Sequence, residues 1–298
     1  MSSGRVTWDD QRAFLAVLDE GSLSAAARRL GVAQPTVRAR IEALEQAVGA
    51  VLFTRSVNGL VPTDQARGLA DSARAMARAS DAFVRAASAP PGEIAGAVRL
   101  SVSEFVGVEV LPPMLASLRA AHPRVIVEVS LSNAAADLLE QEVDIAVRMH
   151  APRHEALVAR KVGAIPLGLF AHPDYLDRRG VPTDMDDLLA HDFIGPDRVR
   201  VDLELAAMLH PGLTRDRFVV RTDNHPAVLA YARAGLGLAV VQRPIGAADP
   251  QLRAVLPELV VGRLDTWIVT HGDLRQVPRV RAVFDHLAEA FTRYAREA

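Results

Sequence analysis

The sequence predicts a chain of the α/β class, in which a small helical part at the N-terminus precedes a larger part built from alternating strands and helices. Three observations support this prediction. Glycines separate short helical patterns over the first 50 residues, small or apolar residues then recur at steps of three and four up to residue 87, and strand-like and helix-like segments alternate from residue 93 onward. The proline- and glycine-rich residues 88–92 interrupt the helical pattern and mark a hinge or linker.

The composition is that of a globular protein with room for more than one domain: 298 residues, of which 50% are hydrophobic and 23% charged. No apolar run approaches the roughly 20 residues that span a bilayer, and the first residues lack an apolar secretory core, so we expect a cytoplasmic protein without a membrane partner. The absence of cysteine excludes disulfides and thiolate metal sites. A net charge of −2 argues against indiscriminate coating of nucleic acid.

Caps and glycine stops delimit the first two helices. Thr7 can cap the first helix, with Asp10 in its first turn, and Gly21 can end it in a left-handed conformation. Ser22 can then accept an orphan amide of a short second helix, which Gly31 ends. Alanines in this second helix are expected to let a neighbouring helix approach closely.

A third helix is expected to begin near Gln34, with Pro35 in its first turn, where the missing amide costs nothing. One face carries an apolar stripe for the core, at Val37, Ile41, Leu44 and Val48. The opposite face carries Gln34, Thr36, Arg38 and Arg40. The major groove of DNA admits one α-helix, whose first turns must offer side chains able to bond base edges and phosphates, so this polar face can meet DNA. A bare pattern of this kind is equally compatible with two packed helices that expose a solvated charged face.

After Gly49 the pattern indicates a wing. Residues 51–55 have the composition of a strand, Asn58 and Gly59 form a strong tight-turn signal, and residues 60–62 return. Arg55 lies on the first of these strands, where it either contacts a phosphate or is an ordinary surface arginine. The N-terminal part is thus predicted to be a winged helix-turn-helix.

Residues 21–55 closely resemble the DNA-binding domain of LysR-type transcriptional regulators, through GSLSAAARRL, QPTV, IEALE and a G-x-x-LF-x-R pattern. The resemblance implies a winged helix-turn-helix domain over residues 1–62, a linker helix over 63–89 and an effector-binding domain over 90–298. It implies DNA contacts from Ser22, Gln34, Pro35, Thr36, Arg38, Arg40 and Arg55. Ala33 and Arg38 stand where the family usually has serine, and Arg38 can alter base preference or add a phosphate contact.

The linker helix is expected to run from Thr63 to about Ala87 with a heptad seam of small or apolar residues. Such a seam needs a partner, and the resemblance implies that this helix pairs two subunits. The expected pairing residues are Leu69, Ala73, Met76, Ser80 and Phe83. The alternative is a helix that packs on its own domain. A homodimer matches paired half-sites on DNA, and assembly of dimers into a homotetramer is left open.

The C-terminal part is expected to form strands at residues 98–102, 125–131 and 143–147, with helices at 111–121 and 134–142, in a mostly parallel sheet. A second series follows, with strands at 167–171, 193–194, 218–220, 238–241 and 267–270, and helices at 184–190, 226–234 and 278–296. This segment resembles the LysR-type effector domain, which is similar to periplasmic solute-binding proteins. The resemblance implies a two-lobed periplasmic-binding-protein-like α/β domain, with lobe I at about 93–164 and 268–298 and lobe II at about 165–267. The chain should cross between lobes near 164–167 and 264–268.

A small-molecule effector is expected between the lobes, because ligands of open parallel sheets bind outside the carboxyl ends of the strands. The candidates from lobe I are Ser103, Glu104, Phe105, Ser132, Asn133 and Arg148. The candidates from lobe II are Asp223, Asn224, His225 and Gln242. Each could instead be a cap or turn residue, and Arg148 and Glu104 could pair with each other. The family's usual hydroxyl and proline are replaced by Ala134 and Gln242, and the effector is not named.

No enzymatic or metal-binding constellation is predicted. His150 and His154 have a helical spacing, but Pro152 between them indicates a loop. We therefore expect no catalytic residues, no metal and no cofactor, and a DNA-binding regulator controlled by a small molecule, with activation or repression undetermined. A solute-binding protein would explain residues 93–298 but not the helix-turn-helix, and an enzyme with a DNA-binding appendage lacks a catalytic set.

Overall fold

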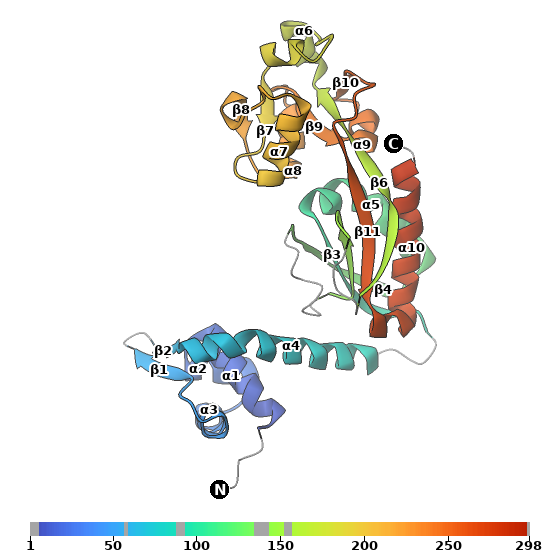
Figure 1. Cartoon of the computed structure of the whole chain (residues 1–298). Coiled ribbons are helices and arrows are strands. Elements are labelled where there is room, and N and C mark those ends of the chain that lie inside the picture. The colour runs from blue at the N-terminus through green and yellow to red at the C-terminus, as the bar shows by residue number, and fades with distance from the viewer. Residues whose placement is uncertain (1–5, 57–58, 88–92, 134–142, 152–156, 297–298) are drawn as a thin grey trace. The chain divides into compact units, whose positions relative to one another are not determined.

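The computed structural model describes residues 6–56, 59–87, 93–133, 143–151 and 157–296. It divides into two compact units, Met1–Ala87 and Ser88–Ala298 (Figure 1). Among the described residues, no helix is long and apolar enough to cross a membrane.

The first unit contains helices α1 (Trp8–Glu20), α2 (Leu23–Leu30) and α3 (Gln34–Val48), the hairpin of β1 (Phe53–Ser56) and β2 (Gly59–Pro62), and the long helix α4 (Asp64–Ala87). The predicted caps are confirmed. Thr7 and Asp10 form a capping box at α1, and the Ser22 hydroxyl accepts a hydrogen bond from the Ala25 amide at α2. Gly21 and Gly31 end these helices in the left-handed conformation. The expected tight turn of the wing includes Asn58, which lies outside the described residues.

The core of this unit lies between α1, α2, α3 and the start of α4. Val37, Ile41 and Leu44 are buried in it as predicted, whereas Val48, at the end of the predicted stripe, is exposed. The wing is attached to the helices by the Leu60 amide, which donates to the carbonyl of Gly21 over 2.8 Å. The wing therefore packs against the turn between α1 and α2.

Helix α4 divides into two halves, which corrects the prediction of one continuous pairing seam. Ala66 and Ala73 are buried in the core of their own unit, and Leu69 packs against it. At these positions α4 packs on its own domain, which is the alternative that the sequence left open. Farther along, Met76, Phe83 and Val84 are 44%, 76% and 63% exposed. Among the described residues of α4, the exposed large apolar side chains lie in this second half.

The second unit is built on a sheet that, within the described residues, has seven strands in the order β10-β6-β11-β5-β3-β4, with β9 also paired to β6. Lobe I comprises β3 (Gly96–Val102), a π-helical segment η1 (Val106–Val110), α5 (Leu111–Ala121), β4 (Val125–Leu131), β5 (Ile145–Arg148) and α10 (Pro278–Arg296). Strand β3 pairs in parallel with β4 and β5. The helix predicted at 134–142 lies outside the described residues.

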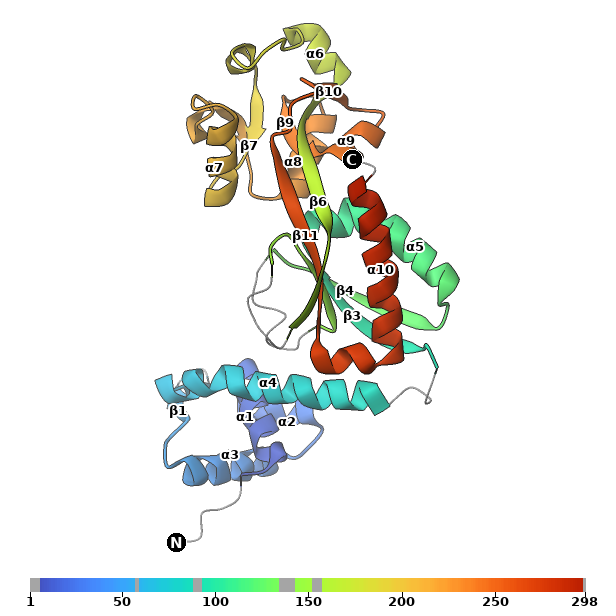
Figure 2. The same ribbon diagram turned by 45° about the vertical axis from the view of Figure 1, so that its right-hand side comes forward.

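Two long strands, β6 (Leu157–Ala171) and β11 (Gly262–His271), run antiparallel to each other and join the lobes (Figures 1 and 2). The segments predicted as crossings lie opposite each other in these strands, since Ala164 opposes Asp265 and Ile165 opposes Leu264. The expectation of parallel strands is confirmed for β3, β4 and β5, whereas β6 and β11 add antiparallel pairings to each other, to β5, to β9 and to β10. A chain that leaves lobe I on one strand and returns on another must run the two strands in opposite directions.

Lobe II comprises α6 (Pro173–Arg179), β7 (Phe193–Gly195), α7 (Arg200–Leu209), β8 (Phe218–Arg221), α8 (His225–Arg233), β9 (Ala239–Gln242), α9 (Arg243–Ala248) and β10 (Arg253–Val255). Helices α6, α7 and α9 were not predicted, and the helix predicted at 184–190 is only a short 3-10 turn, η3 (Asp187–Ala190). The closing helix α10 buries its predicted apolar face, namely Val280, Val283, Phe284, Leu287 and Phe291.

Candidate nucleic-acid interface and ligand cleft

The first turns of α3 present an exposed polar face. Pro35, Thr36 and Arg38 are exposed and Gln34 is half-buried. Within the described part of the chain, Arg38 and Arg55 form no ion pair with a carboxylate. Both guanidinium groups are therefore available to an anionic partner such as a phosphate.

Arg40, the remaining arginine predicted on this face, is held by α1. Its guanidinium forms an ion pair with the Asp9 carboxylate at 2.9 Å, and its side chain is 26% exposed. Asp9 also lies 3.8 Å from Arg12 on its own helix. A DNA phosphate would have to compete with Asp9 for Arg40, so the structure favours Arg40 as a clasp between α1 and α3. Ion pairs of this kind contribute at most about 1 kcal/mol to stability, so a phosphate that displaces Asp9 from Arg40 costs no more than that.

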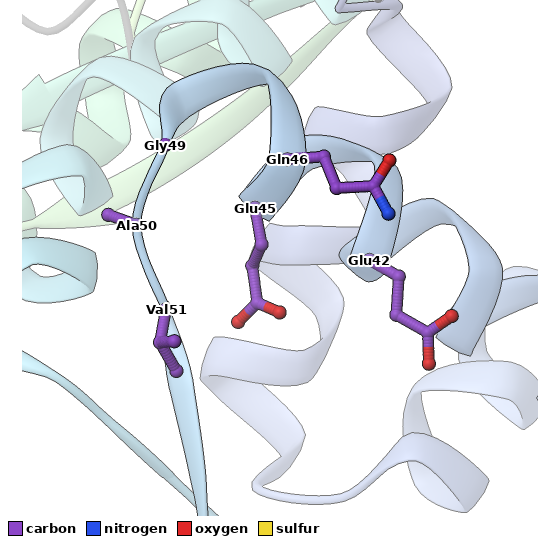
Figure 3. Close-up of a pocket in the computed structure, with 6 residues that line it drawn as sticks. All are labelled: Glu42, Glu45, Gln46, Gly49, Ala50 and Val51. Carbon is purple, nitrogen blue, oxygen red and sulfur yellow. The ribbon is translucent and has the colours of Figure 1, made fainter.

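Glu45 fastens the wing to α3, a role that the sequence did not suggest. Its carboxylate Oε1 accepts hydrogen bonds from the amides of Leu52, at 2.7 Å, and Phe53, at 3.2 Å. Figure 3 shows Glu45 beside Glu42 and Gln46 along α3, facing the strand-like segment at Val51. These residues line a pocket of about 380 Å³, completed by Gly49 and Ala50. Because two carboxylates and no basic side chain line it, this pocket does not suit a phosphate.

The predicted cleft residues of the two lobes meet at Glu104. Its backbone amide donates to Oδ1 of Asn133, at 3.3 Å, so the ends of β3 and β4 are tied together. Its carboxylate Oε2 accepts a hydrogen bond of 2.7 Å from Nδ2 of Asn224, the N-cap of α8 in lobe II. Three of the predicted residues are thus brought together across the lobes. Ser103 and Ser132 flank them, half-buried, and their backbones bond to Gly107 and Val102.

Arg148, a predicted ligand contact, is bonded to the sheet around it. Arg148 is only 6% exposed. Its guanidinium donates hydrogen bonds to the Ser101 hydroxyl, at 2.9 Å, and to the backbone carbonyls of Ser101 and Val147. No bond to Glu104 is formed among the described residues, so the alternative of an Arg148–Glu104 pair is also not realised. The cause is the position of β5 inside the sheet, where all four of its residues are buried.

Two further candidates, Phe105 and Gln242, are also committed to the fold. Phe105 is buried in the main hydrophobic cluster. Gln242 is buried at the end of β9, and its Oε1 accepts a hydrogen bond of 2.8 Å from the hydroxyl of Tyr294 on α10. Neither side chain is directed at a ligand by these contacts.

Asp223 organises the start of α7. Its carboxylate accepts hydrogen bonds from the backbone amides of Arg198, Val199 and Asp197, at 2.9 to 3.1 Å, and these bonds lower the pKa of Asp223. A carboxylate that accepts bonds from three amides anchors the loop before α7.

His225 forms a charged pair with α7. Its Nε2 lies 3.1 Å from the Asp202 carboxylate, and this hydrogen bond, together with the negative charges of Glu104 and Asp223, raises the pKa of His225 above 6.5 despite desolvation. The stability contributed by the pair is therefore fully present below pH 6.5 and is lost as the pH rises through the higher folded-state pKa.

Replacing Asp202 with asparagine is expected to lower the pKa of His225. It should also reduce the extra stability that the folded protein gains at pH 6 relative to pH 8. NMR titration of the imidazole would measure the midpoint, and unfolding at pH 6 and pH 8 would measure the stability. Asp216→Asn, which removes a lobe II carboxylate next to Arg215 and Arg221, serves as the control. A wild-type midpoint at or below 6.5 would contradict the role of Asp202.

Within the described part of the chain, no group of three or more His, Asp or Glu side chains is arranged to hold a metal ion. The predicted site residues gather at two places. One is the polar face of α3, and the other is the junction between lobes at Glu104 and Asn224.

Comparisons with known proteins cover both units. The family described as "Bacterial regulatory helix-turn-helix protein, lysR family" matches residues 8–67, and "LysR substrate binding domain" matches residues 91–292. The chain is 27% identical to the HTH-type transcriptional regulator PgrR of Escherichia coli over 62% of each chain, less than two thirds of that protein. It is 27% identical to the probable regulator LtrA of Klebsiella pneumoniae over 94% of this chain and 93% of that one.

A solved structure shares the fold over nearly the whole chain. Full-length CbnR in complex with its target DNA superposes with a TM-score of 0.67 at 20% identity, over 95% of this chain and 99% of that chain. Both units are therefore accounted for by one known architecture, and the two family matches together extend over most of the sequence. The chain belongs to the LysR-type family of transcriptional regulators.

Proposed function

We propose that this chain is a cytoplasmic regulator, not an enzyme, that binds promoter DNA as a homo-oligomer and responds to a small molecule between its two lobes. Residues 1–62 would bind DNA, residues 63–89 would pair subunits and residues 90–298 would bind the effector. The observation that carries the proposal is the polar face at the start of α3, where Thr36 and Arg38 are exposed and Gln34 is half-buried. The DNA complex of CbnR shows that a protein of this fold engages a target duplex.

The proposed contacts divide by chemistry. Gln34 and Arg38 have the donor and acceptor patterns that bond base edges in the major groove, whereas Arg55 on β1 and the Ser22 hydroxyl suit phosphates. Arg38 stands where the family usually has serine, so we assign it a contact of this chain's own. Arg40 contributes less, because Asp9 already holds its guanidinium.

Arg38→Ala is expected to weaken binding to the chain's own promoter sites by about 1–3 kcal/mol, roughly 5- to 150-fold, because one base or phosphate contact is lost. Footprinting of the purified protein on fragments of its genome would find the sites, and titration at fixed salt would measure the change.

Arg124→Ala is the matched control, since it removes the same charge from lobe I, where Arg124 pairs with Glu93 at 2.8 Å. Equal affinities of the Arg38 variant and the wild type would refute the proposed reading face. Diffuse binding without protected sites would refute sequence-specific recognition.

For pairing of subunits, we propose the exposed second half of α4. Phe83→Asp is expected to weaken the homodimer by roughly 100-fold or more, because each burial of a phenylalanine contributes about 1.5–3 kcal/mol and the charge would have to be desolvated. Sedimentation velocity over a concentration series would measure the dissociation. Phe83→Leu keeps an apolar side chain and should remain paired. An unchanged oligomer in the aspartate variant would exclude this face.

For the effector, we propose that Glu104, Asn133 and Asn224 contact the ligand, with Ser103, Ser132 and His225 around them. A ligand that prefers one arrangement of the lobes shifts the population toward it, by no more than its difference in affinity between the two arrangements. Either outcome, activation or repression, follows from which arrangement binds the promoter.

A further inference from the structure

Helix α8 of lobe II is attached to lobe I at both of its ends. At its start, Asn224 donates to Glu104 over 2.7 Å. At its last residue, the guanidinium of Arg233 donates to both carboxylate oxygens of Glu109, over 2.9 and 3.3 Å. Glu104 and Glu109 belong to one short segment of lobe I, around the π-helical turn η1. One helix of lobe II is therefore fixed to one turn of lobe I by two polar bridges.

Arg233 is the stronger of these attachments, because it neutralises a carboxylate from each lobe. Besides Glu109 it binds Asp249 of lobe II at 2.7 Å, and the side chains of Glu109 and Asp249 are only 16% and 7% exposed. The hydrogen bonds to the two carboxylates raise the pKa of Arg233, which holds its charge in place. Separation of the lobes would break both hydrogen bonds from Arg233 to the Glu109 carboxylate.

Apolar and polar contacts around this junction also hold the two lobes together. Val228, Leu229 and Ala232 on the buried side of α8 belong to the same hydrophobic cluster as Val106 and Val110 of η1. The buried hydroxyl of Tyr294 on α10 donates to Gln242 of lobe II, and burial together with the negative charge of Glu109 raises the pKa of Tyr294. The lobes thus share apolar and polar contacts beyond the two connecting strands.

We propose that the Glu109–Arg233–Asp249 bridge is a latch that sets the separation of the two lobes, so that opening of the cleft requires Arg233 to release Glu109. An effector would act by changing how often this latch is closed. The latch itself follows from the contacts alone, whereas its effect on gene regulation rests on the proposed function.

The absence of cysteine from the chain makes a direct test possible. Cysteines introduced at Ala116, exposed on α5, and Val201, exposed on α7, would carry one spin label in each lobe of the full-length protein. Mixing labelled protein with an excess of unlabelled protein isolates distances within one chain. Arg233→Met is expected to broaden the distance distribution and to shift it by about 2 Å or more, and Glu109→Gln should do the same.

Arg215→Met is the matched control, since Arg215 pairs with Asp197 inside lobe II and should leave the distribution unchanged. An unchanged distribution in a folded Arg233→Met protein would overturn the latch, as would an equal change in the control. If the methionine variant fails to fold, Glu109→Gln, which preserves side-chain size, decides by the same criteria. A changed distribution with an unchanged promoter footprint would support the latch and contradict the proposed regulatory function.

Discussion

Gly59→Ala is expected to destabilise the N-terminal unit by about 3 kcal/mol. Gly59 begins β2 with φ at +130°, a conformation that residues with a Cβ rarely adopt, and a Cβ at this position would lie 2.5 Å from the carbonyl oxygen of Gly21. The backbone strain costs about 1–3 kcal/mol and the steric clash adds a similar amount. The same carbonyl accepts the Leu60 amide, so relief of the clash would break the bond that attaches the wing.

Denaturant unfolding followed by Trp8 fluorescence, in a Trp267→Phe background and at constant protein concentration, would measure this loss. Gly68→Ala on α4 is the control, because nothing lies within 4 Å of the added Cβ and the backbone is helical. Alanine should there stabilise the helix by about 0.5–1 kcal/mol. If both variants are destabilised, or both are stabilised, the clash with the Gly21 carbonyl oxygen is not the cause of the change in Gly59→Ala.

Arg148→Met is expected to destabilise the C-terminal unit by about 3 kcal/mol. The substitution leaves the hydroxyl of Ser101, which is fully buried, and its carbonyl without their arginine donor. An unsatisfied buried polar group costs about 1–3 kcal/mol, and a lost hydrogen bond to a charged donor lies at the upper end of the range for such bonds. The stability of Arg148→Met tests whether Arg148 holds the sheet together, a different role from the ligand contact that the sequence suggested.

Unfolding followed by Trp267 fluorescence, in a Trp8→Phe background, would measure the effect. Arg99→Met supplies the control, because Arg99 lies two residues from Ser101 on β3 and pairs with the partly exposed Glu128 at 2.9 Å. That exposed pair should contribute no more than about 1 kcal/mol. If Arg148→Met is as stable as the wild type, the bonds to Ser101 do not hold the sheet.

Residues that act through their neighbours in sequence were predictable. Thr7, Ser22, Gly21 and Gly31 begin or end helices by bonds and backbone conformations that reach no farther than the next turn, and the structure confirms them. The apolar face of α10 was predictable for the same reason, since a helical repeat is local information. The LysR-type motifs also lie in one contiguous stretch, residues 21–55, so the LysR-type architecture could be identified from the sequence.

The packing of α4 could not be predicted, because a heptad pattern shows which residues share a face of the helix. It does not show whether the same domain or a second subunit packs on that face. Leu69 and Phe83 lie 14 residues apart and occupy equivalent places in the repeat, yet Leu69 packs against the core of its own unit while Phe83 is exposed. The difference arises because the core of the first unit covers the beginning of α4, up to Ala73, and not Phe83.

The roles of the charged residues in the second unit were decided by tertiary structure. Arg148 is the last residue of β5, which is buried within the sheet, so it binds Ser101, while Glu104 follows β3 and reaches Asn224 of the other lobe. Arg233 and Glu109 are 124 residues apart in the chain and carried no local signal. The sequence by itself determined the helix ends, the apolar faces and the family. The tertiary structure decided which charges meet, because an ion pair depends on the approach of distant segments, which no local pattern encodes.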